Sequence, residues 1–246
     1  MKVLFVGDVH NHTYMFNDVQ RLDKEHNFDK IIFLGDYVDD WNTTNKESLE
    51  TLDKVIELKT NNPEKYIFCI GNHELSYLGY PCSGHQKEMD NLVRLKLIEN
   101  LDCFVSYTTI QLGDDLFYCS HAGFVNDYLI NELQPNNTKW EDNIKSLKYN
   151  ILSRLHLMTP CSYFRGGRYP YSSFLWADRR ELMYCPDNLI IPYQIVGHTP
   201  ALTVGSYISE LEKLYFIDTH STYKNGEPYG DKSYLMWDEN KFKILK

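Results

Sequence analysis

The 246-residue sequence has little basic charge, no long apolar run and no closely spaced cysteine pair. It holds 25 Lys and Arg against 34 Asp and Glu, which gives a formal net charge of −9. Sequence-independent binding of DNA or RNA depends on basic surface that neutralises phosphate, so we expect no long nucleic acid as a partner. A bilayer span needs about 18 consecutive apolar residues. No apolar run reaches that length, so we expect no membrane association.

The start of the chain and the cysteines indicate the cytoplasm. The apolar run Val3–Val6 ends at Gly7 and Asp8, and it is shorter than the apolar region of a secretory signal. The cysteines are scattered without a CxxC pair, which is typical of free thiols in a reducing compartment. They are Cys69, Cys82, Cys103, Cys119, Cys161 and Cys185. We therefore expect a cytoplasmic protein.

Strand-like and helix-like segments alternate over the first seventy residues. Apolar runs at 2–6, 30–34 and 66–70 are separated by segments with helical spacing of apolar residues at 14–25 and 45–58. Asn45 is the expected N-cap of the second helical segment. This order predicts parallel strands joined by crossover helices, and hence an α/β layered domain.

The second half of the chain is predicted to be richer in strands. Runs at 104–112 and 116–120 flank Gly113-Asp114-Asp115, which predicts a hairpin, and two helical segments follow, the longer over 138–157. Further strands are expected at 193–196, 214–218, 233–237 and 242–245, with a turn at 238–240. Because the chain has no repeat, low-complexity tract or long linker, we expect one domain over residues 1–246. Residues 159–188 are expected to form a loop-rich insertion near the active site.

Five clusters of metal-ligating residue types follow predicted strands. They are Gly7-Asp8-Val9-His10, Gly35-Asp36-Tyr37-Val38-Asp39, Gly71-Asn72-His73-Glu74, Ser120-His121-Ala122-Gly123 and Gly197-His198-Thr199-Pro200. Loops from neighbouring strands converge at the carboxyl edge of an open α/β sheet, so we expect these clusters to meet. A leading glycine permits the close approach of backbone that such a site needs.

The donors in these clusters suit metal ions. Carboxylates, imidazoles and a neutral amide carbonyl supply hard oxygen and borderline nitrogen ligands. Such a set is too large for one tetrahedral Zn²⁺ and suits two metals that share a carboxylate. The candidate ligands are Asp8, His10, Asp36, Asn72, His121 and His198.

From about Val3 to His198, the clusters resemble the motif set of the calcineurin-like metallophosphoesterases. The branch they resemble most is that of the phosphoprotein phosphatases, which includes bacterial and bacteriophage protein phosphatases and symmetric dinucleoside tetraphosphatases. The resemblance implies a two-sheet β-sandwich flanked by helices, a dinuclear centre and in-line attack on phosphorus by a metal-bridging hydroxide. We expect Mn²⁺ first, with Fe, Zn²⁺ or Co²⁺ as alternatives, because mixed nitrogen and oxygen ligands suit all of them.

The resemblance also implies a role for each matching residue. His73 would be the general acid for the leaving oxygen, and Asp39 would orient it; a histidine suits this role because it can donate a proton near pH 7. Asn72 would contact the substrate phosphate as well as a metal. Asp8, His10 and Asp36 would hold the first metal, Asn72, His121 and His198 the second, and Asp36 would bridge the two.

The sequence departs from the family pattern at two points. Asp40 and Trp41 follow Asp39 where the phosphatases have Arg-Gly, so an arginine that contacts phosphate is missing, and Asn11-His12 stands where the first motif has Gly. Two arginines in the stretch that begins at Trp176 are the candidates to replace it, because a planar guanidinium suits phosphate. These are Arg179 and Arg180, for which a solvated helix start is the other interpretation.

The expected function is hydrolysis of phosphate monoesters by a phosphatase of the Ser/Thr protein phosphatase type. A nucleotide hydrolase acting on dinucleoside polyphosphates or cyclic nucleotides is the alternative, because an arginine is missing and residues 159–174 are rich in aromatics. A non-catalytic binding module is disfavoured, since every ligand type and His73 are present. The expected partner is a phosphorylated protein, or a small phosphoester or nucleotide. The sequence carries no signal for an oligomeric state.

Overall fold

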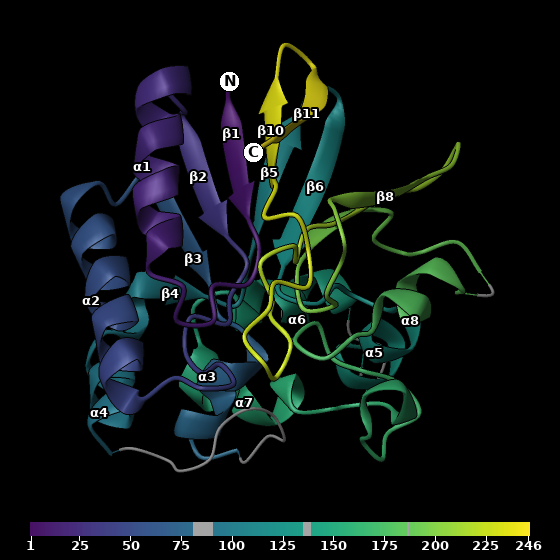
Figure 1. Cartoon of the computed structure of the whole chain (residues 1–246). Coiled ribbons are helices and arrows are strands. Elements are labelled where there is room, and N and C mark those ends of the chain that lie inside the picture. Colours follow the sequence, from purple (N-terminus) through teal and green to yellow (C-terminus); the bar gives the residue numbers. More distant parts are fainter. Residues whose placement is uncertain (81–90, 135–138, 186) are drawn as a thin grey trace.

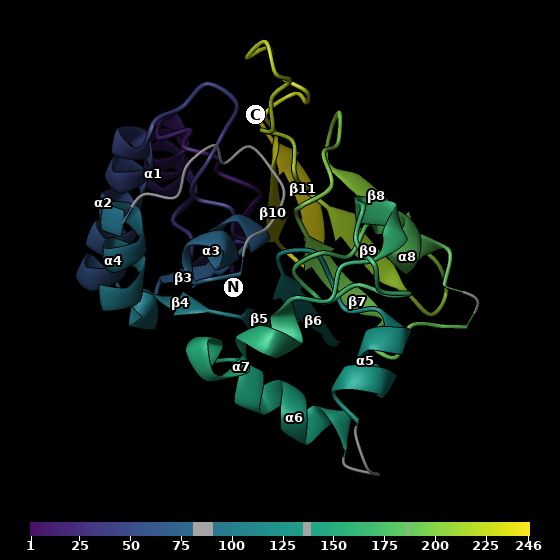
Figure 2. The same cartoon turned by 90° about the horizontal axis from the view of Figure 1, so that it is seen from below.

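Two β-sheets lie face to face at the centre of the molecule, and helices cover their outer sides (Figures 1 and 2). The computed structural model describes residues 1–80, 91–134, 139–185 and 187–246. Between the sheets, Phe5 and Ile32 of the first pack in one apolar cluster with Phe117 and Ile195 of the second. The expected α/β fold, a two-sheet β-sandwich flanked by helices, is thereby confirmed.

The first sheet combines four parallel strands with an antiparallel hairpin at one edge. Its strand order is β11-β10-β1-β2-β3-β4. Its strands are β1 (Val3–Val6), β2 (Lys30–Phe33), β3 (Tyr66–Cys69), β4 (Phe104–Val105), β10 (Tyr234–Asp238) and β11 (Lys241–Leu245). Along β1, Val3 and Phe5 face the second sheet, whereas Leu4 and Val6 belong to the larger cluster that includes the helices. All four side chains are buried, as is usual for a parallel strand covered on both faces.

The second sheet has three parallel strands between two antiparallel edges. Its order is β5-β6-β7-β9-β8. Its strands are β5 (Tyr107–Leu112), β6 (Asp115–Ser120), β7 (Tyr193–Val196), β8 (Gly205–Ile208) and β9 (Lys213–Phe216). The sequence analysis missed β8, which is an edge strand without a buried residue and therefore lacks an apolar pattern.

Helices lie on both outer sides of the sandwich, with α1, α2 and α4 beside the first sheet and α5, α6 and α7 near the second (Figure 2). The helices are α1 (Tyr14–His26), α2 (Asn45–Asn61), α3 (Asn72–Tyr77), α4 (Asn91–Glu99), α5 (Asn126–Glu132), α6 (Trp140–Leu147), α7 (Ile151–Met158) and α8 (Arg179–Met183), with short 3₁₀ turns η1 (Leu101–Cys103) and η3 (Tyr163–Arg165). No described helix is long and apolar enough to cross a bilayer.

The structure corrects two expected boundaries at one residue, Ser106. The run 104–112 is two strands, because the chain passes from the first sheet to the second at Ser106. The helix expected over 138–157 is also two helices, α6 and α7, and Thr138 lies outside the described residues. Ser106 Oγ donates to Leu147 O over 2.7 Å and Ser106 N donates to Lys148 O over 3.1 Å. These bonds satisfy carbonyl groups at the end of α6, where the helix stops.

Local sequence signals account for the start of α2 and for the turn between β10 and β11. The cap of α2 is Thr44 rather than Asn45, and the Glu47 carboxylate accepts a hydrogen bond from Thr44 N at 2.6 Å, as in a capping box. Glu239 and Asn240 have φ values of 52° and 60°. Positive φ at both central residues is what a two-residue hairpin needs, so the expected turn between β10 and β11 is confirmed.

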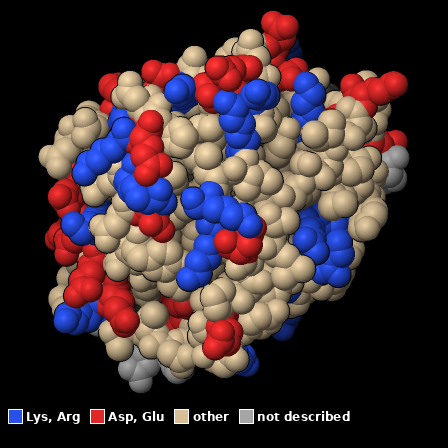
Figure 3. Space-filling view, turned by 45° about the horizontal axis from the view of Figure 1, so that its top comes forward, with Lys and Arg blue, Asp and Glu red and all other residues tan. Residues whose placement is uncertain are grey.

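Surface charge and thiols agree with the composition. Figure 3 shows Lys and Arg side chains scattered among Asp and Glu on one face of the molecule. The described cysteines carry free thiols, and Cys82 lies outside the described residues.

Candidate metal centre

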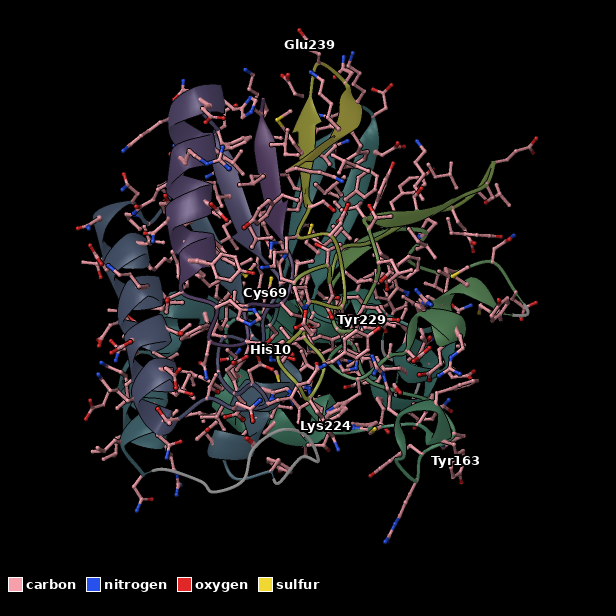
Figure 4. The ribbon with its side chains drawn as sticks, in the orientation of Figure 1. His10, Cys69, Tyr163, Lys224, Tyr229 and Glu239 are labelled. Carbon is pink, nitrogen blue, oxygen red and sulfur yellow. The ribbon has the colours of Figure 1, made fainter. Side chains whose placement is uncertain are left out.

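The candidate ligands meet at the edge where the parallel strands of both sheets end. In Figure 4, His10 lies just below the carboxyl end of β1. Each of the six side chains is buried, with at most 9% of its residue exposed. Asp8 and His10 follow β1, Asp36 follows β2, Asn72 opens α3 after β3, His121 follows β6 and His198 follows β7.

Two glycines allow the loops to approach one another closely. A Cβ on Gly71 would lie 2.1 Å from Asp36 Oδ1, and a Cβ on Gly197 would lie 2.2 Å from Asp8 Oδ1. Each glycine directly precedes a candidate ligand in the chain. A side chain at either position would therefore push a carboxylate away from the centre.

Several non-glycine residues of the site have left-handed backbone. The φ values are 45° at His10, 50° at Asp36, 64° at Asp39 and 62° at His198. Such conformations cost about 1–3 kcal/mol each and persist only where surrounding contacts impose them. Here Asp36 O accepts hydrogen bonds from both Val9 N (3.0 Å) and His10 N (2.7 Å). The first two loops are thus locked together at the centre.

The first group of donors lies around His10. His10 Nδ1 is 2.7 Å from Asp39 O, and because a carbonyl only accepts, this nitrogen donates and leaves a lone pair on Nε2. His10 Nε2 lies 3.7 Å from Asp36 Oδ2 and 3.8 Å from Asp8 Oδ2. An imidazole nitrogen and two carboxylates therefore face one another around a space that a cation can fill.

The second group lies around His121. His121 Nδ1 donates to Leu34 O over 2.9 Å, which directs Nε2 to the centre. His121 Nε2 lies 3.3 Å from Asp36 Oδ2, 2.8 Å from Asn72 Oδ1 and 3.0 Å from His198 Nδ1. Apart from a proton that an imidazole nitrogen can carry, these atoms are acceptors, so the cluster suits a cation.

The pKa directions suit cation binding. Burial acts to raise the pKa of Asp36, but the neighbouring histidines, His121 foremost, hold it well below its usual range. Burial and the charges of Asp218 and Asp36 raise the pKa of Asp8 well above its usual range; this shift reflects crowded negative charge, which a bound cation would offset. Burial lowers the pKa of His10. A neutral imidazole and a charged carboxylate are the forms that ligate metals. The residues present thus fit two divalent cations that share Asp36.

His73 lies beside both groups and pairs with Asp39. Its Nδ1 is 3.4 Å from Asp39 Oδ2, its Nε2 is 3.9 Å from Asp36 Oδ2, and Tyr77 OH donates to Asp39 Oδ1 over 2.6 Å. Burial acts to lower the pKa of His73, but Asp36 and Asp39 raise it to about 9. This raised pKa favours the protonated imidazole at neutral pH. It also lies with His10 and Asp36 among donors that could hold a metal.

Glu74 supports the centre, and the sequence analysis assigned it no role. Its carboxylate accepts hydrogen bonds from the backbone nitrogens of Tyr37 (2.7 Å), Gly71 (2.8 Å), Asp36 (3.1 Å) and Val38 (3.2 Å). Burial, then the charge of Asp36, raises the pKa of Glu74 to about 7. An acid three residues into a helix start is a capping signal and could have identified it.

Asp218 is a second residue of the centre that the sequence analysis did not assign. It follows β9 at the same edge of the molecule, is 1% exposed, and its two oxygens both lie 2.8 Å from Ser221 Oγ. Its charge raises the pKa of Asp8. Its position at a strand end was the available signal.

An open pocket of about 300 Å³ lies over the centre. Its lining includes His10, Asp36, Asn72, His73, His198, Arg165, Trp41 and Trp176. Arg165 Nη2 donates to His198 O and to Thr199 Oγ1, both over 2.9 Å, and its Nε lies 3.4 Å from Asp178 Oδ2. This guanidinium is the cationic side chain that the described part of the chain contributes to the pocket wall.

Arg179 and Arg180, expected at the substrate phosphate, do not line the pocket in the described part of the chain. Arg180 Nε instead donates to Asp178 Oδ1 over 2.7 Å. Asp178 is the N-cap of α8, so this ion pair holds the Arg180 side chain at the start of its own helix. Arg179 is exposed. Arg165, which belongs to the aromatic-rich segment 159–174, lines the pocket instead.

The two departures from the family pattern contact each other. His12 Nε2 is 3.1 Å from Asp40 Oδ2, and Thr222 Oγ1 donates to Asp40 over 3.0 Å. Trp41 Nε1 donates to Thr222 O over 3.2 Å. Asp40 therefore ties the loop after β2 to the loop after β9.

Comparisons with known proteins agree with this geometry. The chain resembles a protein serine/threonine phosphatase of Saccharomyces cerevisiae, with a TM-score of 0.58 and 15% identity over 100% of this chain and 79% of that one. It also resembles the cold-active protein-tyrosine phosphatase of a Shewanella species, with a TM-score of 0.52 and 18% identity over 100% and 80%. The calcineurin-like phosphoesterase family model matches residues 1–202. The chain therefore belongs to the calcineurin-like phosphoesterase family and is a hydrolytic, metal-dependent phosphoesterase.

Proposed function

We propose that the protein hydrolyses phosphate monoesters as a phosphatase of the Ser/Thr protein phosphatase type. The observation that carries the proposal is that three chemical functions converge on one pocket: the cation donors around Asp36, the proton donor His73 and the guanidinium of Arg165. Hydrolysis of a phosphate ester needs an activated water, a proton for the leaving oxygen and compensation of charge on phosphorus. Each need has a group in this pocket.

Two divalent cations are the proposed cofactors. When bound, they would activate water and offset the charge that builds on the phosphoryl oxygens. Mixed nitrogen and oxygen donors make Mn²⁺ the first candidate, with Fe, Zn²⁺ or Co²⁺ as alternatives. One would be held by Asp8, His10 and Asp36, and the other by Asp36, Asn72, His121 and His198.

His73 and Asp39 form the proposed acid pair. The Asp39 carboxylate accepts from Tyr77 OH on one oxygen and faces His73 Nδ1 with the other, which leaves His73 Nε2 directed at the centre. From that position His73 would give its proton to the leaving oxygen.

Arg165 and Asn72 are the proposed contacts for the substrate phosphate. The side chain of Arg165 is held by His198 O and Thr199 Oγ1. A guanidinium has five N–H groups in a fixed fork, so donors remain for a phosphate. Their orientation would be set before the substrate arrives, which is what lowers the cost of binding.

A nucleotide hydrolase is the second candidate, and the pocket walls favour it. Trp41 and Trp176 both line the pocket and could stack on a base. Asp40, also at the pocket wall, adds negative charge, which instead disfavours a highly charged polyphosphate. In favour of the first candidate, the two solved structures described above are of a protein serine/threonine phosphatase and a protein-tyrosine phosphatase. Phosphoprotein, small phosphoester and nucleotide are therefore the substrates to compare. We also propose a cytoplasmic location, on the basis of the free thiols.

A substrate panel tests the proposal. With Mn²⁺ present, we expect a phosphoserine peptide and nitrophenyl phosphate to be hydrolysed with kcat/KM at least about tenfold above that of a dinucleoside tetraphosphate or a cyclic nucleotide. Phosphate release is the readout for each. A nucleotide rate well above the peptide rate would replace the first candidate with the second.

Replacing Asp36 tests the shared ligand. Asp36→Asn should lower the bound Mn²⁺ below two ions per chain and abolish hydrolysis. Metal affinity should fall by more than the 10–100-fold that is typical when a residue hydrogen-bonded to a ligand is replaced. Elemental analysis after dialysis measures the ions. Asp114→Asn, an exposed acid of the turn between β5 and β6, is the matched control. An unchanged metal content in Asp36→Asn would contradict the proposal that Asp36 is a ligand of both ions.

The proton-donor role predicts the pH profile. His73 donates only while protonated, so activity should fall as the pH rises through its pKa. Since Asp39 raises that pKa, Asp39→Asn should move this alkaline limb to lower pH, whereas Tyr77→Phe, which keeps the carboxylate, should move it less. His73→Ala should lower kcat by about 10²–10⁴-fold, most for alkyl esters. Equal losses for alkyl and nitrophenyl esters would argue against proton donation.

Replacing Arg165 tests the phosphate contact. Arg165→Ala should lower kcat/KM for nitrophenyl phosphate by about 10–100-fold, mainly through KM, because a hydrogen bond to a charged group is worth about 1.5–3 kcal/mol. Arg180→Ala is the control, and it should leave KM near the wild-type value. Metal content should stay the same in both variants. The assignment fails if the two substitutions have the same effect.

A further inference from the structure

Exposed aromatic and basic side chains surround Arg165 in the chain, and Arg165 lines the pocket. They are Tyr163, Phe164, Arg168 and Tyr169 from the loop after α7, and Arg179 at the start of α8. The exposed fractions are 72% for Tyr163, 53% for Phe164 and 45% for Tyr169. In Figure 4, Tyr163 lies at the lower right of the molecule, to one side of His10. We call this set the aromatic rim.

The loop that carries the aromatic rim is closed by its own backbone. Tyr169 N donates to Cys161 O over 3.1 Å, and Gly167 N donates to Ser162 O over 2.9 Å. A Cβ on Gly167 would lie 1.9 Å from Cys161 O, which shows how tightly the chain returns on itself. Ser162 N also donates to Ser172 Oγ over 3.0 Å. Its aromatic side chains are thus presented to solvent by an ordered loop, which reduces the entropy cost of binding.

Hydrogen bonds connect the aromatic rim to the pocket. Arg165, in the same loop, donates to Thr199 Oγ1 over 2.9 Å, and Arg179 N lies 3.3 Å from the same oxygen. Thr199 follows His198, which lines the pocket. The Arg180 guanidinium lies over the Phe164 ring at 5.0 Å. The loop and α8 therefore make one continuous border beside the proposed phosphate contact.

The charge of the aromatic rim contrasts with that of the chain. Residues 159–177 contain no Asp or Glu, although the chain carries a net charge of −9. Arg165 and Arg180 both pair with Asp178. Within the described ranges, no acidic side chain lies within ion-pair distance of Arg168 or Arg179, and both are exposed. These two charges are available to an anionic partner.

We propose that the aromatic rim binds the polypeptide that flanks the phosphorylated residue of a protein substrate, and that it selects acidic flanks. This proposal rests on the proposed function and specifies which phosphoproteins would be preferred, namely those with acidic residues beside the phosphorylated one. Arg168 and Arg179 do not line the pocket of about 300 Å³ over the centre, whereas a peptide substrate extends beyond that pocket on either side. Aromatic and arginine side chains are those that dominate peptide and protein contacts. Acidic side chains complement Arg168 and Arg179.

Two phosphoserine peptides of equal length test the proposal, one with Asp and Glu beside the phosphoserine and one with Lys. With Mn²⁺ at low salt, wild-type protein should show a KM at least about tenfold lower for the acidic peptide, and added salt should reduce the difference. The double variant Arg168→Glu/Arg179→Glu should remove or reverse this preference. It should leave KM for nitrophenyl phosphate within about twofold of wild type, because neither arginine lines the pocket.

Matched variants separate the outcomes. Arg94→Glu, on exposed α4 across the molecule from α8, makes the same kind of charge change and should alter neither peptide (Figures 1 and 2). Phe164→Ala should raise KM for both peptides but not for nitrophenyl phosphate. Equal KM for the two peptides in wild type overturns the rim and leaves the proposed function standing. Hydrolysis of nucleotides with neither peptide cleaved overturns the proposed function and the rim together.

Discussion

The buried carboxylate of Asp36 is the point on which the centre depends. One of its oxygens faces Nε2 of both His10 and His121, and the other accepts the backbone N–H of His73 at 2.9 Å. A charge so buried is stable only when other groups compensate it. The surrounding imidazoles, backbone N–H groups and left-handed turns can all be understood as the means of holding this one anion in place.

The location of the centre was predictable, because strand ends are visible in the sequence. Apolar runs ending in Gly-Asp or Gly-His at Asp8, Asp36 and His198 needed only the rule that parallel strands end at one edge. The sheet switch at Ser106 was not predictable from the same pattern. A run of strand-forming residues looks continuous whether or not it changes sheets, and the bonds from Ser106 to the end of α6 depend on tertiary contacts.

The arginine that lines the pocket could not be chosen from the sequence either. Arg165, Arg179 and Arg180 are alike in type, and the sequence does not show which of them lines the pocket. Asp178 caps α8 and takes the Arg180 side chain, while Arg165 reaches His198 from a loop whose closure depends on Gly167. Glu74 shows the converse case. Its role as acceptor for four backbone N–H groups follows a local capping pattern that could have been applied.

The division of the donors between the two sheets has a consequence for the folding equilibrium. Asp8, His10 and Asp36 extend from the first sheet, and His121 and His198 from the second. Ions that join these donors would fasten the halves of the sandwich to each other. By mass action, a ligand that binds only the native state stabilises it by RT ln(1 + [L]/Kd), about 2.7 kcal/mol at a hundred times Kd. The metal concentration in the cell would then affect how long the folded protein persists as well as its catalytic rate.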